Sequence, residues 1–500
     1  MVISASRKKI IEFLLLYLYN YSSGLIINHF LFERCTIIMD STKKLGVLGL
    51  SFLSINAILG LRNIAFASTI GPSAIFYWIV AALIYFIPIG LIVAELSTTY
   101  PNQGGMGVWV RKAFGEKASF LCSWFFWIAN FTYYPSLLLT TTIAIAYGIN
   151  HPQLATNPMQ TSIISSIIFW IVTLLTLKGT KMSGRLASIG APLGVIVPAI
   201  LIFGFGFYSM FNGEPSATNF THESIMPNNI SFGTIMFLST LMFGFSGAEM
   251  LGTIAGNVKN PQKTFPRAIF ITSIIIAFVY IVATVAFQFV ITISSDQTAT
   301  ALYLFADKVT TQFGLQFSLS QLLGICFLLA FVGSLSFLIL NPSVMIAESG
   351  KEILPKDLLK ENKDGMPSKL VIGQAVAVTL ILLLSAFVPS VSSALNMLIL
   401  MSTLAFFIPY VFLISAYIKL RLTEKNIVRP FKIKRTKMAI LVAIIGMVSV
   451  VGTIALTLIP APGTTLLEYL PIVLGPILFG SIGLILYSKG TKNKKGQAKQ

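Results

Sequence analysis

The chain has 500 residues, of which 55% are hydrophobic and 10% are charged, and its mean hydropathy is +0.83. Soluble globular domains carry about 25% charged residues, and disordered chains have low hydrophobicity, so both classes are excluded. The formal net charge of +18 would suggest nucleic-acid binding in a soluble protein. Here the Lys and Arg residues lie mostly between long apolar runs, where membrane topology accounts for them. The composition therefore predicts a polytopic membrane protein that binds no nucleic acid.

Residues 1–44 precede the first predicted membrane span, and we expect them to form a leader that does not cross the membrane. The run 10–32 is apolar, but it contains Glu12 and His29. A crossing there would also place the cations at 7–9 on the opposite side from Lys43 and Lys44, against the positive-inside rule. A thirteenth span at this position remains the alternative.

Twelve apolar runs are long enough to cross a bilayer, whose core of about 30 Å needs roughly 20 helical residues. Nearly all cations in the connections fall on one side of the membrane, and Lys308 is the exception. This asymmetry predicts that both termini are cytoplasmic and that the protein lies in the cell membrane. The runs cover residues 45–68, 73–94, 119–147, 161–177, 188–211, 232–255, 268–293, 318–346, 370–388, 394–418, 438–459 and 466–488.

Few charged residues lie within these runs. Arg62 is in the first run and Glu249 is in the sixth, whereas Glu95 and Glu348 lie near the ends of the second and eighth. A charge at membrane depth is costly unless it faces protein or water, so Arg62 and Glu249 are candidate functional residues. We expect Glu95 and Glu348 to be ordinary interfacial residues.

Both candidates adjoin sequence that interrupts a helix. In the first run, Gly60 and Asn63 flank Arg62, and in the sixth run Ser246 lies between Gly244 and Gly247. A broken helix exposes free N–H groups at one half-helix start and free carbonyls at the other half-helix end, which suit the carboxylate and ammonium of an amino acid. Close helix packing is the alternative explanation for these glycines.

Catalytic and metal-binding patterns are not apparent in the sequence. The three cysteines, Cys35, Cys122 and Cys326, form no CxxC pair, and no nucleophile, dinucleotide or Walker motif occurs in a suitable context. We expect buried thiols, no metal, no cofactor and no enzyme activity. A channel, a membrane enzyme or a transporter-like nutrient sensor remain alternatives to a transporter.

Two long motifs resemble those of the amino acid, polyamine and organocation (APC) superfamily. The first covers residues 95–105 (ELSTTYPNQGG) and 108–115 (VWVRKAFG), and the second covers 245–249 (FSGAE) and 258–268 (VKNPQKTFPRA). Within the superfamily, the glutamate:GABA antiporter family is the most similar. That narrower resemblance rests on residues 61–63 (LRN), 389–394 (PSVSSA) and 429–431 (RPF).

The resemblance implies an all-α polytopic fold of 12 transmembrane helices, with a LeuT-like 5+5 inverted repeat plus two C-terminal helices. Residues 45–211 and 232–418 would form the two repeats, 438–488 the trailing helices, and 489–500 a basic cytoplasmic tail.

It also implies amino acid antiport by alternating access, with a proton-coupled symporter as the alternative. Phe243 would close over the substrate, and Glu249 would act in gating or proton sensing. The partners would be a small amino acid or amine and membrane lipid, and a homodimer is left open. The substrate-binding residues implied are Ile58, Gly60, Arg62, Asn63, Phe243, Ser246 and Gly247.

The two charges also bear on the substrate. A buried Arg62 that faces the cavity would favour an acidic substrate, whereas a pair between Arg62 and Glu249 would neutralise it and favour a neutral one.

Overall fold

The computed structural model describes residues 45–60, 62–100, 105–178, 180–226, 232–247, 249, 258–363, 365–460 and 466–497. The predicted leader 1–44 lies outside the described residues, as do residues 101–104 of the first long motif, Ala248 of the second, and the stretch 250–257 between the two parts of the second. Within these ranges the regular structure is helical, and extended pairing is limited to two isolated bridges.

The helices carry the following labels and bounds: α3 (Val47–Ile58), α4 (Arg62–Ser68), α5 (Ala74–Ala81), α6 (Ile87–Thr99), α7 (Gly105–Phe114), α8 (Glu116–Gly148), α9 (Pro158–Thr176), α10 (Thr180–Phe211), α11 (His222–Ile225), α12 (Phe232–Gly244), α13 (Pro261–Val290), α14 (Ala301–Gln312), α15 (Leu319–Ser349), α16 (Ser368–Ser385), α17 (Val391–Thr423), α18 (Thr436–Thr457) and α19 (Leu466–Gln497). A π-helical turn, η3 (Ala82–Phe86), joins α5 to α6.

Seven described helical segments are long and apolar enough to span a membrane. The chain is therefore a helical multi-pass membrane protein, as its composition predicts. The helix ends differ from the predicted runs most clearly at the C-terminus, where α19 continues to Gln497 through the residues expected to form a tail. Lysine is a good helix former, so the apolar helix extends into the basic segment. The seven segments are Gly71–Thr99, Pro158–Thr176, Gln262–Val290, Ser368–Ser385, Val391–Thr423, Thr436–Thr457 and Tyr469–Thr491.

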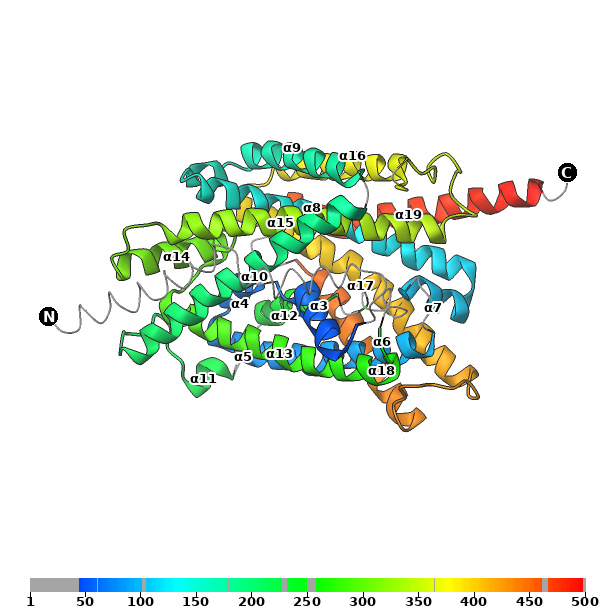
Figure 1. The fold of residues 1–500 in the computed structure, drawn as a ribbon, viewed down its shortest axis with the longest axis horizontal. Helices are drawn as coiled ribbons and strands as arrows, with labels where there is room; N and C mark the ends of the chain where they lie inside the picture. The colour runs from blue at the N-terminus through cyan, green and yellow to red at the C-terminus, as the bar shows by residue number, and fades with distance from the viewer. Residues whose placement is uncertain are drawn as a thin grey trace.

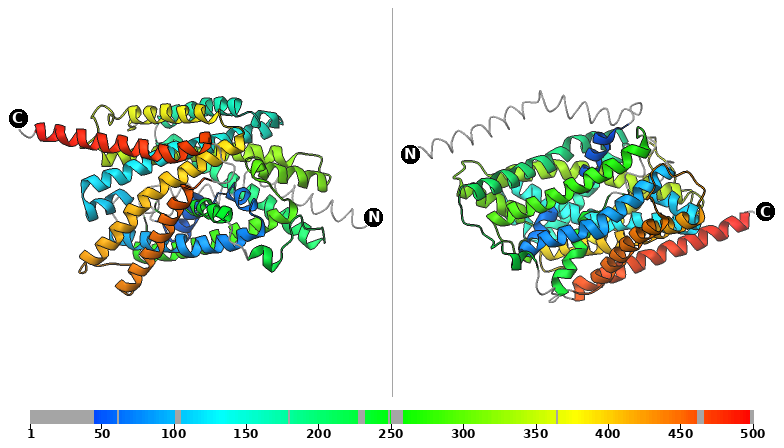
Figure 2. Two further views of the ribbon diagram at one scale, coloured as in Figure 1. Left: turned by 180° about the vertical axis from the view of Figure 1, so that it is seen from behind. Right: turned by 90° about the horizontal axis from the view of Figure 1, so that it is seen from below.

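The long helices run roughly along one axis of the molecule (Figure 1). Helices α9 and α16 pack side by side along one edge, and α13 packs against α5 and α6 at the opposite edge. The shorter helices α3, α4 and α12 lie between these edges. Helix α19 extends past the rest of the bundle at its C-terminal end (Figure 2).

Small residues allow close backbone contact between the long central helices. A Cβ atom on Gly324 of α15 would lie 2.4 Å from the backbone nitrogen of Gly148 in α8, and one on Gly206 of α10 would lie 2.6 Å from the Cβ of Ala286 in α13. Glycine at such contacts is typical of membrane helix packing. The contacts hold α8 against α15 and α10 against α13, around the interrupted helices.

Two helices stop near the middle of the molecule. Helix α3 ends at Ile58 and α4 begins at Arg62, so the first predicted span is interrupted around Gly60. Helix α12 ends at Gly244, and Gly247 has a φ of 122°. That value lies in the left-handed region that favours glycine, which explains why the chain leaves the helix at this point.

Candidate functional site

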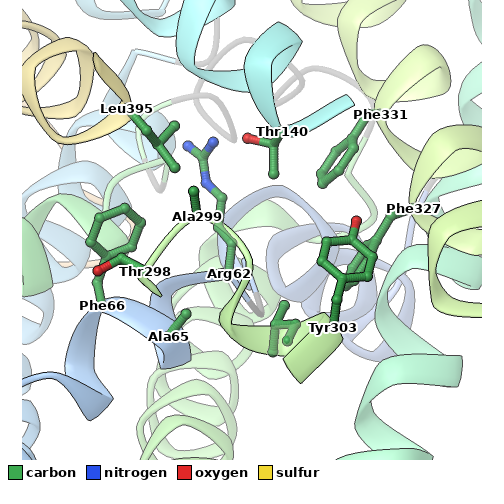
Figure 3. A pocket seen from close by; sticks show the side chains of 11 residues that line it. Arg62, Ala65, Phe66, Thr140, Thr298, Ala299, Tyr303, Phe327, Phe331 and Leu395 are labelled. Atoms are coloured by element: carbon green, nitrogen blue, oxygen red, sulfur yellow. The ribbon is translucent and has the colours of Figure 1, made fainter. Parts of the chain in front are cut away.

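A small cavity adjoins the first helix break (Figure 3). Arg62, the first residue of α4, reaches into it, and the polar side chains of Thr140, Thr298 and Tyr303 also line it. Its volume is about 20 Å³, enough for about one water molecule. A cavity of this size is too small to hold a molecule as large as an amino acid. The other lining residues are Ala65, Phe66, Ala299, Leu302, Phe327, Phe331 and Leu395.

The Arg62 guanidinium makes few interactions with the described residues around this site. Its Cζ lies 5.1 Å from the centroid of the Tyr133 ring, on α8. Its Nη1 atom is buried and makes no hydrogen bond to the described residues. A half-buried guanidinium with a buried donor that has no partner among the described residues is a strong binding group for a carboxylate.

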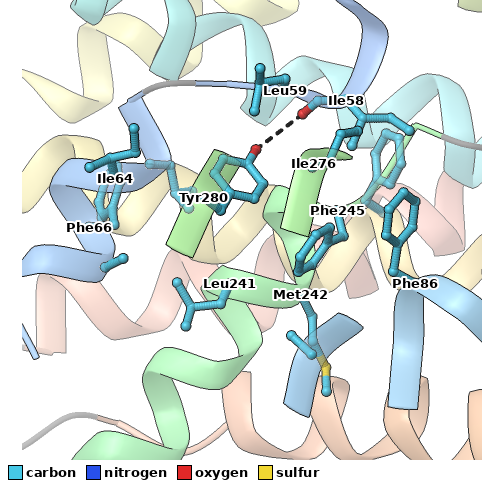
Figure 4. Packing of buried hydrophobic residues seen from close by; sticks show 14 of the residues in the cluster. Ile58, Leu59, Ile64, Phe66, Phe86, Leu241, Met242, Phe245, Ile276 and Tyr280 are labelled. Carbon is cyan, nitrogen blue, oxygen red and sulfur yellow. Dashed lines mark hydrogen bonds between the residues drawn. The ribbon is translucent and has the colours of Figure 1, made fainter. Parts of the chain in front are cut away.

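The Tyr280 hydroxyl, on α13, links the two helix breaks. It accepts hydrogen bonds from the Gly60 N–H and from Asn63 Nδ2, both at 3.0 Å. Its own proton faces the Gly244 carbonyl at 3.0 Å and the Ile58 carbonyl at 3.3 Å (Figure 4). One side chain thus satisfies backbone groups at the end of α3, in the gap before α4 and at the end of α12.

Aromatic packing fixes the position of the Tyr280 ring. Trp78 of α5 stacks on it with ring centroids 4.2 Å apart, and Phe245 meets it edge-on at 5.5 Å. The Trp78 indole donates a hydrogen bond to Thr284, one turn along α13, at 3.1 Å. Sequence analysis missed Tyr280, because a tyrosine within a long apolar run gives no signal of its partners.

We expect Tyr280→Phe to loosen the first break while leaving the fold intact. The ring and its stacking remain, but the Gly60 N–H loses its acceptor, and a hydrogen bond contributes about 1 kcal/mol or somewhat more when a buried group is left unpaired. Hydrogen exchange at the Gly60 amide, followed by mass spectrometry, should be about tenfold faster or more. Tyr77→Phe is the matched control, since that buried hydroxyl has no partner among the described residues. Equal exchange in the two variants would contradict the link.

Glu249 lies in a separate polar group on the other side of the α12 end. Its Oε2 atom accepts hydrogen bonds from the Gly247 N–H at 3.0 Å and from the Tyr410 hydroxyl, on α17. Its Oε1 atom is buried without a hydrogen-bond partner among the described residues. Nearby, the hydroxyls of Tyr85 and Ser246 are 2.9 Å apart. The carboxyl group is therefore surrounded by hydroxyl groups and backbone, and no described cation pairs with it.

Arg62 and Glu249 do not pair in the described part of the chain. Arg62 faces Tyr133 and the cavity, whereas Glu249 bonds to Gly247 and Tyr410. The sequence left two alternatives, in which Arg62 either faces the cavity or pairs with Glu249. In the structure Arg62 faces the cavity, so its charge is available there.

The predicted site residues thus fall into three linked groups. Ile58, Gly60 and Asn63 meet the α12 end through Tyr280. Ser246, Gly247 and Glu249 meet Tyr85 and Tyr410. Phe243 packs edge-on against Tyr133, with ring centroids 5.9 Å apart, and the Arg62 guanidinium lies over the same Tyr133 ring. The aromatic ring of Tyr133 is the contact that Arg62 and Phe243 share.

Glu95 is buried, contrary to the expectation of an interfacial residue. Its side chain is 1% exposed and pairs with Arg421 of α17 and, at 3.2 Å, with Arg429. It also accepts hydrogen bonds from the Tyr417 hydroxyl and the Ile433 N–H, both at 3.0 Å. The sequence gives no sign of this burial, because the two arginines are more than 300 residues from Glu95 and approach it only in the folded chain.

Glu348 is exposed, and its interfacial position stays a prediction. Its side chain is 63% exposed and lies 2.5 Å from Lys351, one turn away. The two helix-end acids that look alike in the sequence therefore have different environments.

One face of α17 carries the partners of both buried acids. Tyr410 contacts Glu249, and Tyr417 and Arg421 contact Glu95. The spacing of seven and then four residues keeps these side chains on the same side of the helix. Pro409, directly before Tyr410, lies inside the same helix.

Residues 45–482 match the family model described as amino acid permease. The chain belongs to the amino acid permease family. This confirms the resemblance to the APC superfamily and to its glutamate:GABA-like branch. The family is one of transporters, so this member of it is a multi-pass membrane transporter.

Several relatives match most of this permease. An uncharacterized transporter of Legionella pneumophila is 30% identical over 84% of this chain and 90% of its own length. A Lactococcus lactis subsp. lactis protein named as an agmatine/putrescine antiporter is 27% identical over 90% of this chain and 96% of its own. A glutamate/gamma-aminobutyrate antiporter of Lactococcus lactis subsp. cremoris is 25% identical over 68% of each chain.

The fold of the permease also matches a solved transporter structure. The crystal structure of a manganese transporter mutant of Eremococcus coleocola superposes with a TM-score of 0.57, covering 89% of this chain and 94% of that one, at 13% sequence identity. At that identity the match concerns the fold alone.

Proposed function

We propose that this permease is a secondary active antiporter of the cell membrane that exchanges an amino acid for a related amino acid or amine. It works by alternating access in a LeuT-like fold of 12 transmembrane helices with both termini in the cytoplasm. Residues 45–211 and 232–418 form the inverted repeats, and 438–488 form the two trailing helices. The family and the antiporter names of two relatives support this proposal.

The observation that carries the proposal is the meeting of two interrupted helices beside the Arg62 guanidinium, whose buried Nη1 atom has no hydrogen-bond partner among the described residues. The breaks at Gly60 and Gly244 leave backbone N–H and carbonyl groups at mid-helix, the type of group that binds an amino acid backbone in transporters of this architecture. Arg62 adds a positive charge next to them. We therefore assign an acidic amino acid, of the glutamate type, as one of the two exchanged substrates.

Within this proposal, Ile58, Gly60, Asn63, Ser246 and Gly247 bind the backbone of the substrate once the site opens. Phe243 closes over it, as its position against Tyr133 supports. Glu249 acts in gating or proton sensing. Its burial, with no cationic partner among the described residues, also favours the second candidate function, proton-coupled symport.

Counterflow in proteoliposomes tests the function. Vesicles loaded with glutamate should accumulate labelled glutamate or GABA from outside, and vesicles without internal substrate should not. Measurement at about pH 5.5 and pH 7.5, with and without an imposed proton gradient, separates antiport from symport. Uptake into empty vesicles driven by the proton gradient would favour symport. Absence of counterflow with any amino acid or amine would overturn the proposal.

A further inference from the structure

A strongly basic loop joins α17 to α18. Residues 425–437, which we call the cationic loop, contain six Lys and Arg residues and no acid. Arg429 is nearly buried against Glu95. The other five are exposed, and none takes part in an ion pair in the described part of the chain. The five exposed cations are Lys425, Lys432, Lys434, Arg435 and Lys437.

The backbone of the cationic loop is held in place by the buried ion cluster, which consists of Glu95, Arg421 and Arg429. Arg429 donates hydrogen bonds to the carbonyls of Leu420 and Glu424, both at 2.9 Å. Arg421 donates to the Ile433 carbonyl at 2.6 Å, and the Ile433 N–H donates to Glu95. Glu424 is itself engaged by the Tyr100 hydroxyl and by a nearby lysine. The acids next to the loop are therefore occupied, and the exposed cations keep their full charge.

The cationic loop lies at the edge of a lipid-facing surface. Helix α18 begins at Thr436, within the loop, and is apolar enough to span a membrane. Six large apolar residues are exposed along it, which places them against lipid tails. The cations immediately before them are then at the depth of the lipid headgroups. The six residues are Met438, Leu441, Ile444, Ile445, Val448 and Val451.

The cationic loop differs in charge balance from another highly charged connection of the chain. The connection at 348–369 contains five lysines, but it also contains five acids. The positive-inside rule counts Lys and Arg and gives little weight to acids, so both connections satisfy it. Of these two connections, the cationic loop alone carries a large net positive charge.

We propose that the cationic loop is a docking surface for the headgroups of anionic phospholipids in the adjacent leaflet. Each exposed cation near such a surface contributes about 1 kcal/mol of attraction. Because Arg421 and Arg429 tie the loop to Glu95 at the end of α6, the bound lipid stabilises the contact between α6 and α17. The proposal rests on the membrane assignment and not on the identity of the transported substrate.

Lipid titration of the purified full-length permease in detergent tests this inference. The test variant replaces Lys432, Lys434 and Lys437 by Gln. The matched control replaces Lys356, Lys360 and Lys363 by Gln, which removes the same charge from the acid-balanced connection. Native mass spectrometry counts bound phosphatidylglycerol, with phosphatidylcholine and inorganic phosphate as competing probes. Exchange is measured afterwards in vesicles with and without phosphatidylglycerol.

The test variant should bind phosphatidylglycerol about tenfold or more weakly than wild type, and the control variant should match wild type. Displacement of the lipid by inorganic phosphate at equal concentration would overturn the lipid assignment, and so would equal binding by both variants. The binding result holds even if no substrate is exchanged, so a failure of the proposed function is distinguished from a failure of this inference.

Discussion

Arg62→Ala should lower the apparent affinity for an acidic substrate by about tenfold to 150-fold. A hydrogen bond to a charged group contributes about 1.5–3 kcal/mol, and 1.4 kcal/mol corresponds to a factor of ten. The Arg62 guanidinium has a free buried donor in the cavity, so a substrate carboxylate gains this interaction in the native protein and loses it in the variant. The measurement is the half-saturating concentration for counterflow.

A neutral amino acid serves as the internal control for this variant. Its affinity should change by less than about fivefold, since a hydrogen bond to a neutral group is worth about 1 kcal/mol at most sites and 1.4 kcal/mol corresponds to a factor of ten. Arg62→Lys should give an intermediate loss, because lysine keeps the charge without the planar pair of donors. An equal loss for acidic and neutral substrates would assign Arg62 a structural role instead.

Glu95→Gln should destabilise the permease by about 3–5 kcal/mol. The change leaves the guanidinium groups of Arg421 and Arg429 buried without their shared carboxylate, and breaking a buried ion pair from one side has a cost of that size. The Glu95 and Arg421 side chains are each 1% exposed, so solvent does not screen them. Thermal unfolding in detergent measures the loss.

Glu348→Gln is the matched control for the loss of stability in Glu95→Gln. It makes the same substitution at another helix end, but the Glu348–Lys351 pair is exposed and should contribute about 1 kcal/mol or less. Similar unfolding temperatures for the two variants would contradict the stabilising role assigned to the buried ion pairs of Glu95. Replacing Glu95, Arg421 and Arg429 together by apolar residues should recover part of the stability, because no unpaired charge remains.

The membrane class and the two long motifs could be read from the sequence because they depend on local composition and on residues adjacent in the chain. The break around Gly60 was predictable for the same reason, since glycine and polar residues within an apolar run are a local signal. The family assignment confirms what the motifs indicate.

The partners of these local features could not be predicted. Tyr280 lies more than 200 residues from Gly60, and Arg421 lies 326 residues from Glu95. A single apolar run gives no indication of which of its side chains will meet a distant helix. The same limit applies to Glu95 and Glu348, which have similar positions in the sequence and opposite burial.

Helix α17 connects two acids that are far apart. From Tyr410 to Arg421 the helix rises about 16 Å. One face of this segment contacts Glu249 at the Tyr410 end and Glu95 at the Arg421 end. This segment is uninterrupted after Pro409, where the helix lacks a backbone N–H and bends most easily. A swivel at Pro409 therefore cannot release Glu249 without also straining the contacts of Glu95.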